Sequence, residues 1–359
     1  MTQPINIAEY EALARERLSA MAHAYYAGAA NDELTLAENA AAWDRIRLRP
    51  RVLVDVRHVD TSTTVLGQSV TMPILTAPCG FNALGHADGE RAVARAVASA
   101  GTIQVVSTAA TTSLEDVAAA STGPKWFQLY CYRDREVTRD LVRRAEAAGY
   151  RALCLTVDVP FLGRREREVR NGFHLPPGMS LRNLEPYAAA EMAAAERDSA
   201  LARYVNALWD PSLDWSMLEW LRSITSLPLV LKGVLTGEDA ALGVQHGAQA
   251  IIVSNHGGRQ LDGAVSGAEA LPEVVEAVGG RAEVLVDGGI RRGSHVLRAL
   301  AMGARAVLIG RPYLWGLAVG GEPGVHHVLE ILHQELVLAM ALSGRPTVGS
   351  IDRSLLARR

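Results

Sequence analysis

Short apolar runs rich in β-branched residues recur along the chain, and nearly all end in a polar residue or a glycine. Runs that are apolar throughout are typical of strands buried on both faces of a parallel sheet. The eight runs occupy residues 74–79, 103–107, 126–130, 152–157, 228–232, 249–254, 283–287 and 306–310. Alanine-rich segments with helical spacing stand between most of them, at 90–100, 114–120, 135–148, 237–246, 271–278 and 294–302. This alternation predicts an α/β fold with a parallel sheet.

Eight strand–helix units predict a closed (β/α)8 barrel, the TIM-barrel fold, at a length typical of that fold with additions. A doubly wound sheet is the alternative, but it would carry a nucleotide-binding fingerprint after the first strand, and the residues GFN at 80–82 do not form one. We therefore expect a single domain over residues 1–359. Its expected parts are N-terminal helices and a hairpin over 1–73, the barrel over 74–320, and a C-terminal helix and tail over 321–359.

Three segments outside this rhythm also carry patterns. Apolar residues at helical spacing predict helices within 7–45, and the alternation over 52–72 predicts a short hairpin. The interval 160–227 lacks the rhythm and includes an alanine-rich run at 188–195. Because long loops inside a compact domain are uncommon and usually functional, we expect an extended active-site loop or lid after the fourth strand.

Composition narrows the class of protein. Hydrophobic residues make up 49% of the chain, enough for a large core, and the net charge of −3 comes without any Lys/Arg run that would suit nucleic acid. The three cysteines are too few and too scattered for a disulfide framework or a zinc site, so we expect buried thiols in a reducing compartment and no metal. The chain shows no signal-peptide pattern and no apolar run as long as a membrane span, which predicts a cytoplasmic protein without a membrane partner.

The stretch 251–264 (IIVSNHGGRQLDGA) concentrates the strongest candidate chemistry. A buried strand breaks there into polar residues, and (β/α)8 barrels place their active sites at the C-terminal ends of their strands. His256 is a candidate acid/base group, and Arg259 offers a planar fork that fits a carboxylate. Gly257 and Gly258 let the backbone turn sharply. A glycine-rich turn whose histidine caps a neighbouring loop is the alternative, but the grouping of Ser, His and Arg favours function.

The other strands end in similar residues, so their polar ends should form a ring on one rim of the barrel. The last two strands bring glycines and arginines, in the segments DGGIRRG and IGRP, to the place where such barrels often hold a phosphate. The sequence therefore predicts a phosphorylated cofactor beside the His256 strand.

The chain resembles the family of FMN-dependent 2-hydroxy acid oxidases and dehydrogenases, which includes glycolate oxidase, lactate oxidase and mandelate dehydrogenase. The resemblance covers almost the whole chain and rests on the motifs YYAGAANDELTLAENAAAWDRIRLRPR, WFQLYCYRD, LTVDVPFLGRRE, LVLKGV, SNHGGRQLD, VDGGIRRG and LIGRP. It implies FMN as cofactor and oxidation of an L-2-hydroxy acid to the 2-oxo acid. Oxygen, giving hydrogen peroxide, or another acceptor would take the electrons, with an oxidase favoured over a dehydrogenase. It also implies a homo-oligomer, a tetramer or octamer.

The resemblance further implies roles for individual residues. His256 matches the catalytic base, Asp158 the carboxylate that orients it, and Tyr130 a phenol that hydrogen-bonds the substrate hydroxyl. The groups matched to the substrate carboxylate are Tyr25, Arg164 and Arg259. FMN contacts are implied for Pro78, Cys79, Gly80, Ser107, Gln128, Thr156, Lys232, Ser254, Asp287, Gly288, Gly289, Ile290, Arg291, Gly310 and Arg311.

These roles agree with the chemistry of the reaction. Oxidation of a 2-hydroxy acid removes a proton and an electron pair, so His256 can take the proton while Asp158 stabilises the resulting imidazolium. FMN takes the electrons, and Lys232 can compensate the charge that it gains. Whether the histidine removes the α-proton first, or the hydroxyl proton as hydride leaves, stays open.

Two positions depart from the family pattern. Ala109 stands where glycolate oxidases carry a bulky tryptophan over the substrate, which predicts a substrate larger than glycolate, such as lactate, a longer aliphatic acid or a mandelate-like acid. Gly80 stands where typical oxidases have alanine and mandelate dehydrogenase has glycine. Because this position lies beside the flavin ring, the speed of the reaction with oxygen stays open.

Two other functions fit these residues less well. Another FMN-barrel enzyme, such as a peptide-tailoring oxidase or a redox-neutral isomerase, would not need His256, Arg259, Tyr130 and Tyr25 together. A non-catalytic ligand-binding barrel would not need the pairing of His256 with Asp158.

Overall fold

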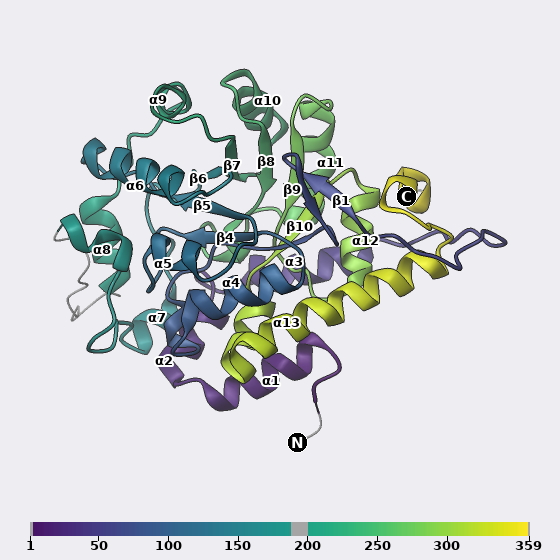
Figure 1. The fold of residues 1–359 in the computed structure, drawn as a ribbon, viewed down its shortest axis with the longest axis horizontal. Helices are drawn as coiled ribbons and strands as arrows, with labels where there is room; N and C mark the ends of the chain where they lie inside the picture. Colours follow the sequence, from purple (N-terminus) through teal and green to yellow (C-terminus); the bar gives the residue numbers. More distant parts are fainter. Residues whose placement is uncertain (1–2, 188–199, 358–359) are drawn as a thin grey trace.

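The computed structural model describes residues 3–187 and 200–357, and its centre is a closed barrel of eight parallel strands (Figure 1). Around the barrel the order is β10-β3-β4-β5-β6-β7-β8-β9. The strands are β3 (Ile74–Thr76), β4 (Gln104–Ser107), β5 (Lys125–Leu129), β6 (Leu153–Thr156), β7 (Leu229–Val234), β8 (Ala250–Val253), β9 (Glu283–Val286) and β10 (Ala306–Ile309). Each lies in one of the eight predicted apolar runs, give or take two residues, so the predicted (β/α)8 barrel is confirmed.

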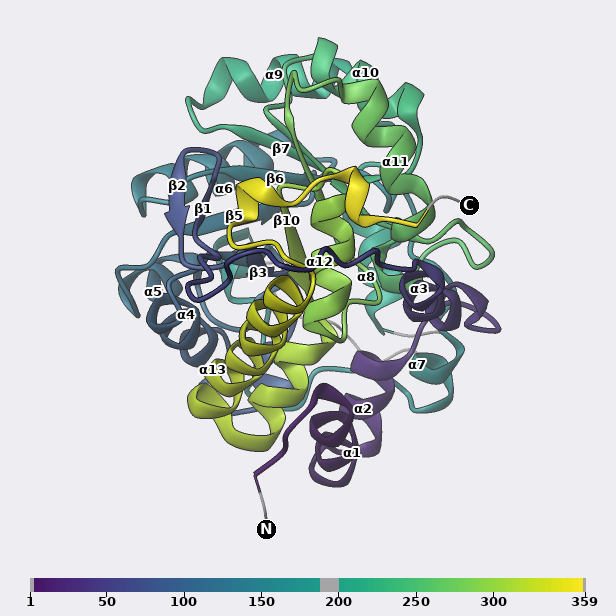
Figure 2. The same ribbon diagram turned by 90° about the vertical axis from the view of Figure 1, so that its right-hand side faces the viewer.

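Helices cover the outside of the barrel, as the alanine-rich segments predicted. They are α4 (Gly89–Ser99), α5 (Leu114–Ala119), α6 (Arg135–Ala147), α9 (Ser216–Ile224), α10 (Gly237–Gln245), α11 (Gly267–Val278), α12 (Gly293–Ala301) and α13 (Arg311–Leu342). Gly320 and Gly321 interrupt the helical geometry of α13, and the part after this kink packs along α1 and α4 (Figure 2). No helix among the described residues is long and apolar enough to cross a membrane.

The interval after the fourth barrel strand is more regular than predicted. It contains α7 (Glu166–Arg170), α8 (Ala200–Leu208) and α9, and α9 is the helix that leads from β6 to β7. The predicted active-site loop region over 160–227 therefore contains helices as well as loop. The alanine-rich run predicted at 188–195 lies outside the described residues.

The N-terminal segment forms three helices and a hairpin, and the hairpin covers one end of the barrel. Helices α1 (Ile7–Arg17), α2 (Ala20–Ala27) and α3 (Leu34–Arg45) confirm the predicted helical region. Strands β1 (Thr63–Val65) and β2 (Gln68–Val70) form the predicted hairpin, and both residues of its turn have positive φ, as tight hairpins require. Val65 and Val70 pack on the apolar side chains inside the barrel, at the N-terminal ends of the strands.

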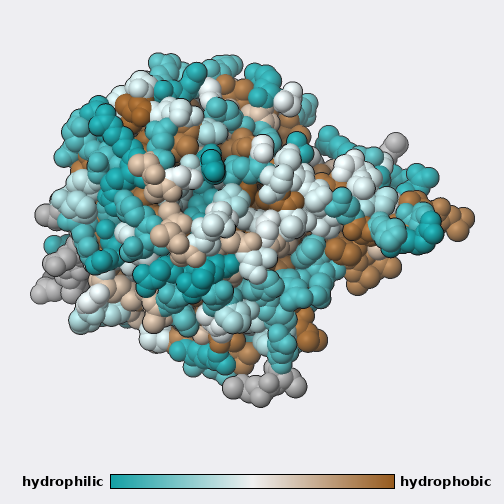
Figure 3. All heavy atoms as spheres, viewed as in Figure 1, coloured by the Kyte–Doolittle hydropathy of each residue, from teal (hydrophilic) through white to brown (hydrophobic). Residues whose placement is uncertain are grey.

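The loop between α3 and β1 projects from the body at the right of Figure 1. Figure 3 shows hydrophobic side chains at this tip. The side chains of Val52 and Leu53 are fully or almost fully exposed, and Val54 is partly exposed.

Candidate active site

Inward-facing side chains change from apolar to polar as each barrel strand approaches its C-terminal end. Residues two apart on a strand point the same way, because side chains alternate. Val230 and Ile252 belong to the apolar core inside the barrel, and two positions later come Lys232 and Ser254. On four other strands a polar residue likewise follows two positions after an apolar core residue; these are Ser107, Gln128, Thr156 and Asp287. Inside the barrel, a layer of polar side chains therefore lies directly above a layer of apolar side chains, toward the C-terminal ends of the strands.

A pocket opens above this polar layer, and most of the predicted site residues line it. The predicted FMN contacts in its wall are Pro78, Cys79, Gly80, Ser107, Lys232, Asp287, Gly288, Gly289, Ile290, Arg291, Gly310 and Arg311. The predicted catalytic and substrate residues in its wall are Tyr25, Ala109, Tyr130, His256 and Arg259. Behind the wall lie Gln128, Thr156, Asp158 and Ser254. Among the described residues no cluster of His, Cys, Asp and Glu could hold a metal ion.

His256 and Asp158 form a largely buried pair, with side chains 17% and 13% exposed. Nδ1 of the imidazole lies 3.0 Å from Oδ1 of Asp158, and a carboxylate can only accept, so Nδ1 carries the hydrogen. Burial lowers the pKa of His256 and outweighs the opposing attraction of Asp158. Burial alone would raise the pKa of Asp158, but the attraction of His256 and Lys232 lowers it overall. The imidazole is therefore neutral near pH 7, with Nε2 available to take a proton.

The turn that carries His256 is strained. His256, Gly257 and Gly258 have φ values of 57°, 66° and 77°, a left-handed run that histidine rarely adopts. Asn255 stabilises the turn by accepting from the backbone N–H of Gly258 at 3.1 Å, while its amide pairs with that of Asn39 in α3. A Cβ at position 258 would lie 2.7 Å from a backbone nitrogen of α3. The surrounding packing therefore holds the histidine in place.

Lys232, on β7, points into the barrel and lines the pocket. Its Nζ donates to Oγ of Ser254 at 3.0 Å and lies 3.3 Å from Oδ2 of Asp287. Burial would lower the pKa of Lys232, but the charges of Asp287 and Asp158 raise it overall. This side chain is therefore a permanent cation in the wall of the pocket.

Several buried polar atoms around Lys232 have no hydrogen-bond partner within the described part of the chain. They are Nε2 of Gln128, Oγ1 of Thr156 and Oδ1 of Asp287. Unsatisfied buried polar atoms are rare in folded proteins and call for a partner. A flavin ring presents carbonyl, N–H and ring-nitrogen groups along one side, so these residues fit the isoalloxazine of FMN.

Two arginines, both partly buried, stand at the ends of the last two strands. Arg311 donates to the carbonyl oxygens of Tyr26, Gly28 and Gly257, and Arg291 donates to that of Ile290. Neither makes an ion pair with an acid in the described ranges. Burial lowers the pKa of Arg311 to about 9 and also lowers that of Arg291. Two partly buried cations with no acidic partner among the described residues fit a phosphate group.

Two tyrosines face the pocket beside the histidine. Burial raises the pKa of Tyr25 to about 12, and it also raises the pKa of Tyr130. Tyr130 stacks on Trp209 with ring centroids 3.7 Å apart, and the guanidinium carbon of Arg259 lies 4.8 Å from the centroid of Tyr25. Both phenols therefore stay protonated and can donate hydrogen bonds.

The arginine from the segment LGRRE that reaches the pocket is Arg165, not the predicted Arg164. The side chain of Arg164 is exposed, whereas Arg165 is buried and lines the pocket. The motif contains two arginines in succession, and only the path of the chain before α7 decides which one points inward.

Both departures from the family pattern lie on one wall. Ala109 and Gly80 line the pocket, and the backbone N–H of Phe81 donates to the carbonyl oxygen of Ala109. A Cβ at Gly80 would lie 3.3 Å from Cβ of Ala109 and 3.3 Å from Oη of Tyr25. A bulkier residue at either position would therefore occupy the same space.

Sequence reasoning missed the residues that the interval after β6 contributes. Leu162, Leu201 and Trp209 line the pocket, and Glu168 lies directly behind its arginines. Leu162 lies in the motif LTVDVPFLGRRE, but the other three belong to no pattern that singles them out. Only the path of this interval over the barrel brings them to the site.

Comparisons with known proteins agree with this geometry. A family model described as FMN-dependent dehydrogenase matches residues 14–358. The chain is 56% identical over 360 residues to an L-lactate oxidase of Nostoc sp., covering 99% of each chain. It is 51% identical over 352 residues to glycolate oxidase of Spinacia oleracea, covering 98% of this chain and 95% of the relative. A crystal structure of mandelate oxidase with (S)-4-hydroxymandelic acid is similar with a TM-score of 0.94 at 44% identity, over 99% of this chain and 98% of that one.

Proposed function

Because the chain belongs to the family of FMN-dependent dehydrogenases, we propose that it binds FMN in this pocket and oxidises an L-2-hydroxy acid to the 2-oxo acid. Its relatives include oxidases of lactate and glycolate, so oxygen is the proposed electron acceptor and hydrogen peroxide the second product. One observation carries the proposal above all others. A neutral histidine, held by a largely buried carboxylate, lines a pocket together with phenols, a guanidinium and two arginines that have no acidic partner among the described residues.

Some residues around His256 bind the substrate carboxylate, and others transfer the proton. Arg259 and Arg165 offer guanidinium N–H groups to the substrate carboxylate, and Tyr25 adds a phenol donor. Nε2 of His256 takes the proton, and Asp158 stabilises the imidazolium that results. Bound FMN would supply the acceptor for the electron pair. Lys232 would compensate the negative charge that the cofactor gains.

The proposed substrate is larger than glycolate. Ala109 lines the pocket with a methyl group, and apolar side chains from the interval after β6, Leu162 and Leu201, face the same space. A relative that oxidises lactate and a similar structure that holds a hydroxymandelic acid support this choice. Lactate, a longer aliphatic 2-hydroxy acid or a mandelate-like acid would fit such a wall.

The test is anaerobic reduction of the enzyme-bound flavin by a panel of acids. We expect L-lactate, a longer aliphatic L-2-hydroxy acid or (S)-mandelate to bleach the flavin absorbance faster than glycolate, and the D enantiomers to leave it oxidised. Admission of oxygen should restore the absorbance and release one hydrogen peroxide per turnover. An oxidised spectrum with every acid of the panel would contradict the proposed reaction.

We also propose a cytoplasmic homo-oligomer, a tetramer or octamer. The exposed apolar tip formed by Val52, Leu53 and Val54 supports this assembly, because single chains rarely expose adjoining large apolar side chains. Light scattering during size-exclusion chromatography would give the molar mass of the assembly. The mass of a monomer at all micromolar protein concentrations would contradict the proposal.

A further inference from the structure

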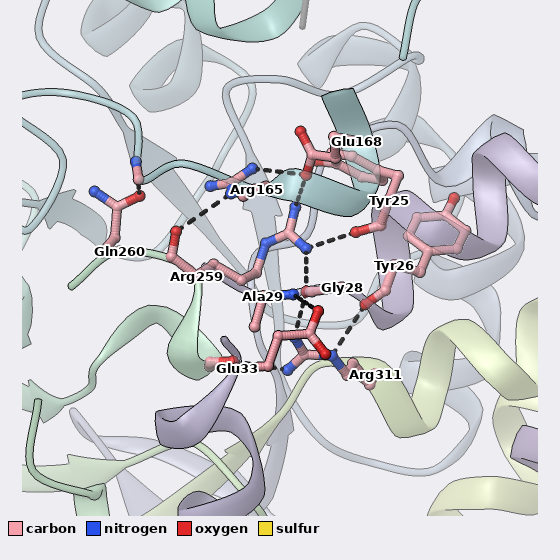
Figure 4. A network of polar contacts seen from close by, with 12 residues as sticks. Tyr25, Tyr26, Gly28, Ala29, Glu33, Arg165, Glu168, Arg259, Gln260 and Arg311 are labelled. Atoms are coloured by element: carbon pink, nitrogen blue, oxygen red, sulfur yellow. Dashed lines mark hydrogen bonds and ion pairs between the residues drawn. The ribbon is translucent and has the colours of Figure 1, made fainter. Parts of the chain in front are cut away.

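A buried carboxylate stands between the two arginines of the pocket. Oε1 of Glu168 accepts from Nη1 of Arg165 at 3.2 Å and from Nη2 of Arg259 at 3.0 Å. Figure 4 shows the three side chains meeting, and Nε of Arg165 also donates to the carbonyl oxygen of Arg259. These three residues are named the Arg–Glu–Arg triad below.

Stability alone is a weak reason for this triad. The exposed fractions of its side chains are 5% for Arg165, 0% for Glu168 and 13% for Arg259, so three charges are withdrawn from water. The cost of desolvation often exceeds the attraction in such buried groups, and apolar residues in their place are frequently as stable. The pocket-facing position of both arginines suggests a role in ligand binding instead.

Arg259 keeps two donors for a ligand despite its contacts. Its Nη1 donates to the carbonyl oxygens of Tyr25 and Gly28, and one N–H of Nη2 donates to Glu168. Within the described chain, Nε–H and the second N–H of Nη2 have no partner. Two adjacent N–H groups match the two oxygens of one carboxylate.

The surroundings leave the triad with one net positive charge. Tyr25 and Tyr130 are neutral phenols, and Glu33, nearby, is paired with Arg167. Of the further cations that line the pocket, Lys232 is paired with Asp287, and Arg291 and Arg311 belong to the proposed phosphate end. Burial and the repulsion of Arg259 lower the pKa of Arg165, and Glu168 opposes this shift. A single carboxylate on a ligand would therefore neutralise the triad.

We propose that Glu168 holds the substrate subsite at one positive charge and thereby selects 2-hydroxy acids with one carboxylate over those with two. A second carboxylate would have to be buried against the apolar wall at Ala109 without a counter-charge, which is costly. Glu168 is a positioning and specificity-determining residue in this account, since it acts through the arginines. The inference rests on the proposed function for the identity of the ligand, and its test needs no turnover.

The test compares two ligands that differ by one charge. 2-Hydroxyisobutyrate carries one carboxylate, and 2-hydroxy-2-methylmalonate has the same skeleton with a carboxylate in place of one methyl. Neither has an α-hydrogen, so neither can be oxidised by loss of that hydrogen. Their dissociation constants are measured with the FMN-loaded protein from the change in flavin absorbance, and the ratio of the two constants is the readout.

Glu168→Gln removes the charge and nearly keeps the shape. The affinity for the dicarboxylate relative to the monocarboxylate should rise about tenfold or more, because an added charge acts twice as strongly on a dianion. Glu168→Asp keeps the charge, so it should keep the wild-type ratio even if both ligands bind more weakly. Glu166→Gln is the matched control. It removes the same charge from the same helix, where Glu166 pairs with the exposed Arg170, and should change nothing.

A charge-restoring variant covers the case in which Glu168→Gln does not fold. Arg165→Gln combined with Glu168→Gln leaves one buried positive charge, and the ratio should return to within about threefold of the wild-type value. The inference is overturned if Glu168→Gln weakens both ligands equally, or if the double variant strongly favours the dicarboxylate. If no acid reduces the wild-type flavin but these ratios behave as expected, the proposed function fails while the charge assignment stands.

Discussion

His256 can act as a base only while its imidazole is neutral. Burial lowers its pKa below the usual 6.5, and Asp158 partly opposes that shift. Since the deprotonated form is the active one, kcat/KM should stay on its plateau at neutral pH and fall only on acidification below about pH 6.5. A family resemblance pointed to both residues, but only the structure shows which effect dominates the pKa.

Asp158→Asn should change this pH profile in a defined direction. Removal of the carboxylate removes the charge that raises the pKa of His256, so the acidic limb of kcat/KM should move to lower pH. The plateau should fall about 10²-fold or more, because the imidazolium loses its partner. The measurement is kcat/KM against pH for both proteins. A limb that moves to higher pH would contradict the pairing seen at 3.0 Å.

Ala109→Trp should reverse the order of substrates. The indole would fill the space beside the wall that Ala109 forms with Gly80. The ratio of kcat/KM for glycolate to kcat/KM for larger acids should therefore rise about tenfold or more. The control is Ala110→Ser, a change at the next residue, which is buried outside the pocket wall. An unchanged ranking in Ala109→Trp would remove Ala109 from the substrate wall.

At the level of elements, the barrel was predictable and the cover over its site was not. Buried parallel strands are apolar on both faces and stand out in any sequence, which is why all eight were found. The polar layer could also be found, because Lys232, Ser254 and Asp287 follow apolar runs at fixed spacing. The interval after β6 has no such regularity. Its contribution depends on long-range packing. The sequence therefore led to Arg164 instead of Arg165, and it gave no sign that Trp209 lines the pocket.

Gly258→Ala should loosen the turn that carries His256. The residue has φ of 77°, and a methyl group there would meet the backbone of α3 at 2.7 Å. We expect a loss of about 2 kcal/mol or more in the free energy of unfolding and a lower Tm. Gly263→Ala is the control, since its φ is also positive but no atom lies within 4 Å of the added Cβ. An equal loss in both variants would show that close packing on α3 does not matter.

At the level of the whole molecule, the charges of the pocket match the proposed ligands. Two partly buried arginines, Arg291 and Arg311, face the expected phosphate, and the Arg–Glu–Arg triad faces the expected carboxylate. The sequence showed which cations were present. It could not show that Glu168 joins two of them, because that contact depends on how α7 packs against the turn after β8.

Arg311→Ala should weaken FMN binding. The loss of a charge-assisted contact to phosphate should raise the dissociation constant of FMN about 10-fold to 100-fold. Less FMN should then stay bound on dialysis, and Tm should fall toward that of the apoprotein, because only the folded chain binds the cofactor. Arg292→Ala is the control, since Arg292 pairs with Glu335 on the outside. Equal FMN content in wild type and Arg311→Ala would contradict the phosphate assignment.

The most direct measurement is rapid anaerobic reduction of bound FMN in wild type and in His256→Ala, with the preferred 2-hydroxy acid at saturation. His256→Ala should retain FMN and still bind 2-hydroxyisobutyrate, but its rate of flavin reduction should be about 10²–10⁴-fold lower, the usual contribution of a general base. A rate within a few-fold of wild type, with FMN and the ligand bound, would contradict the assignment of His256 as the base.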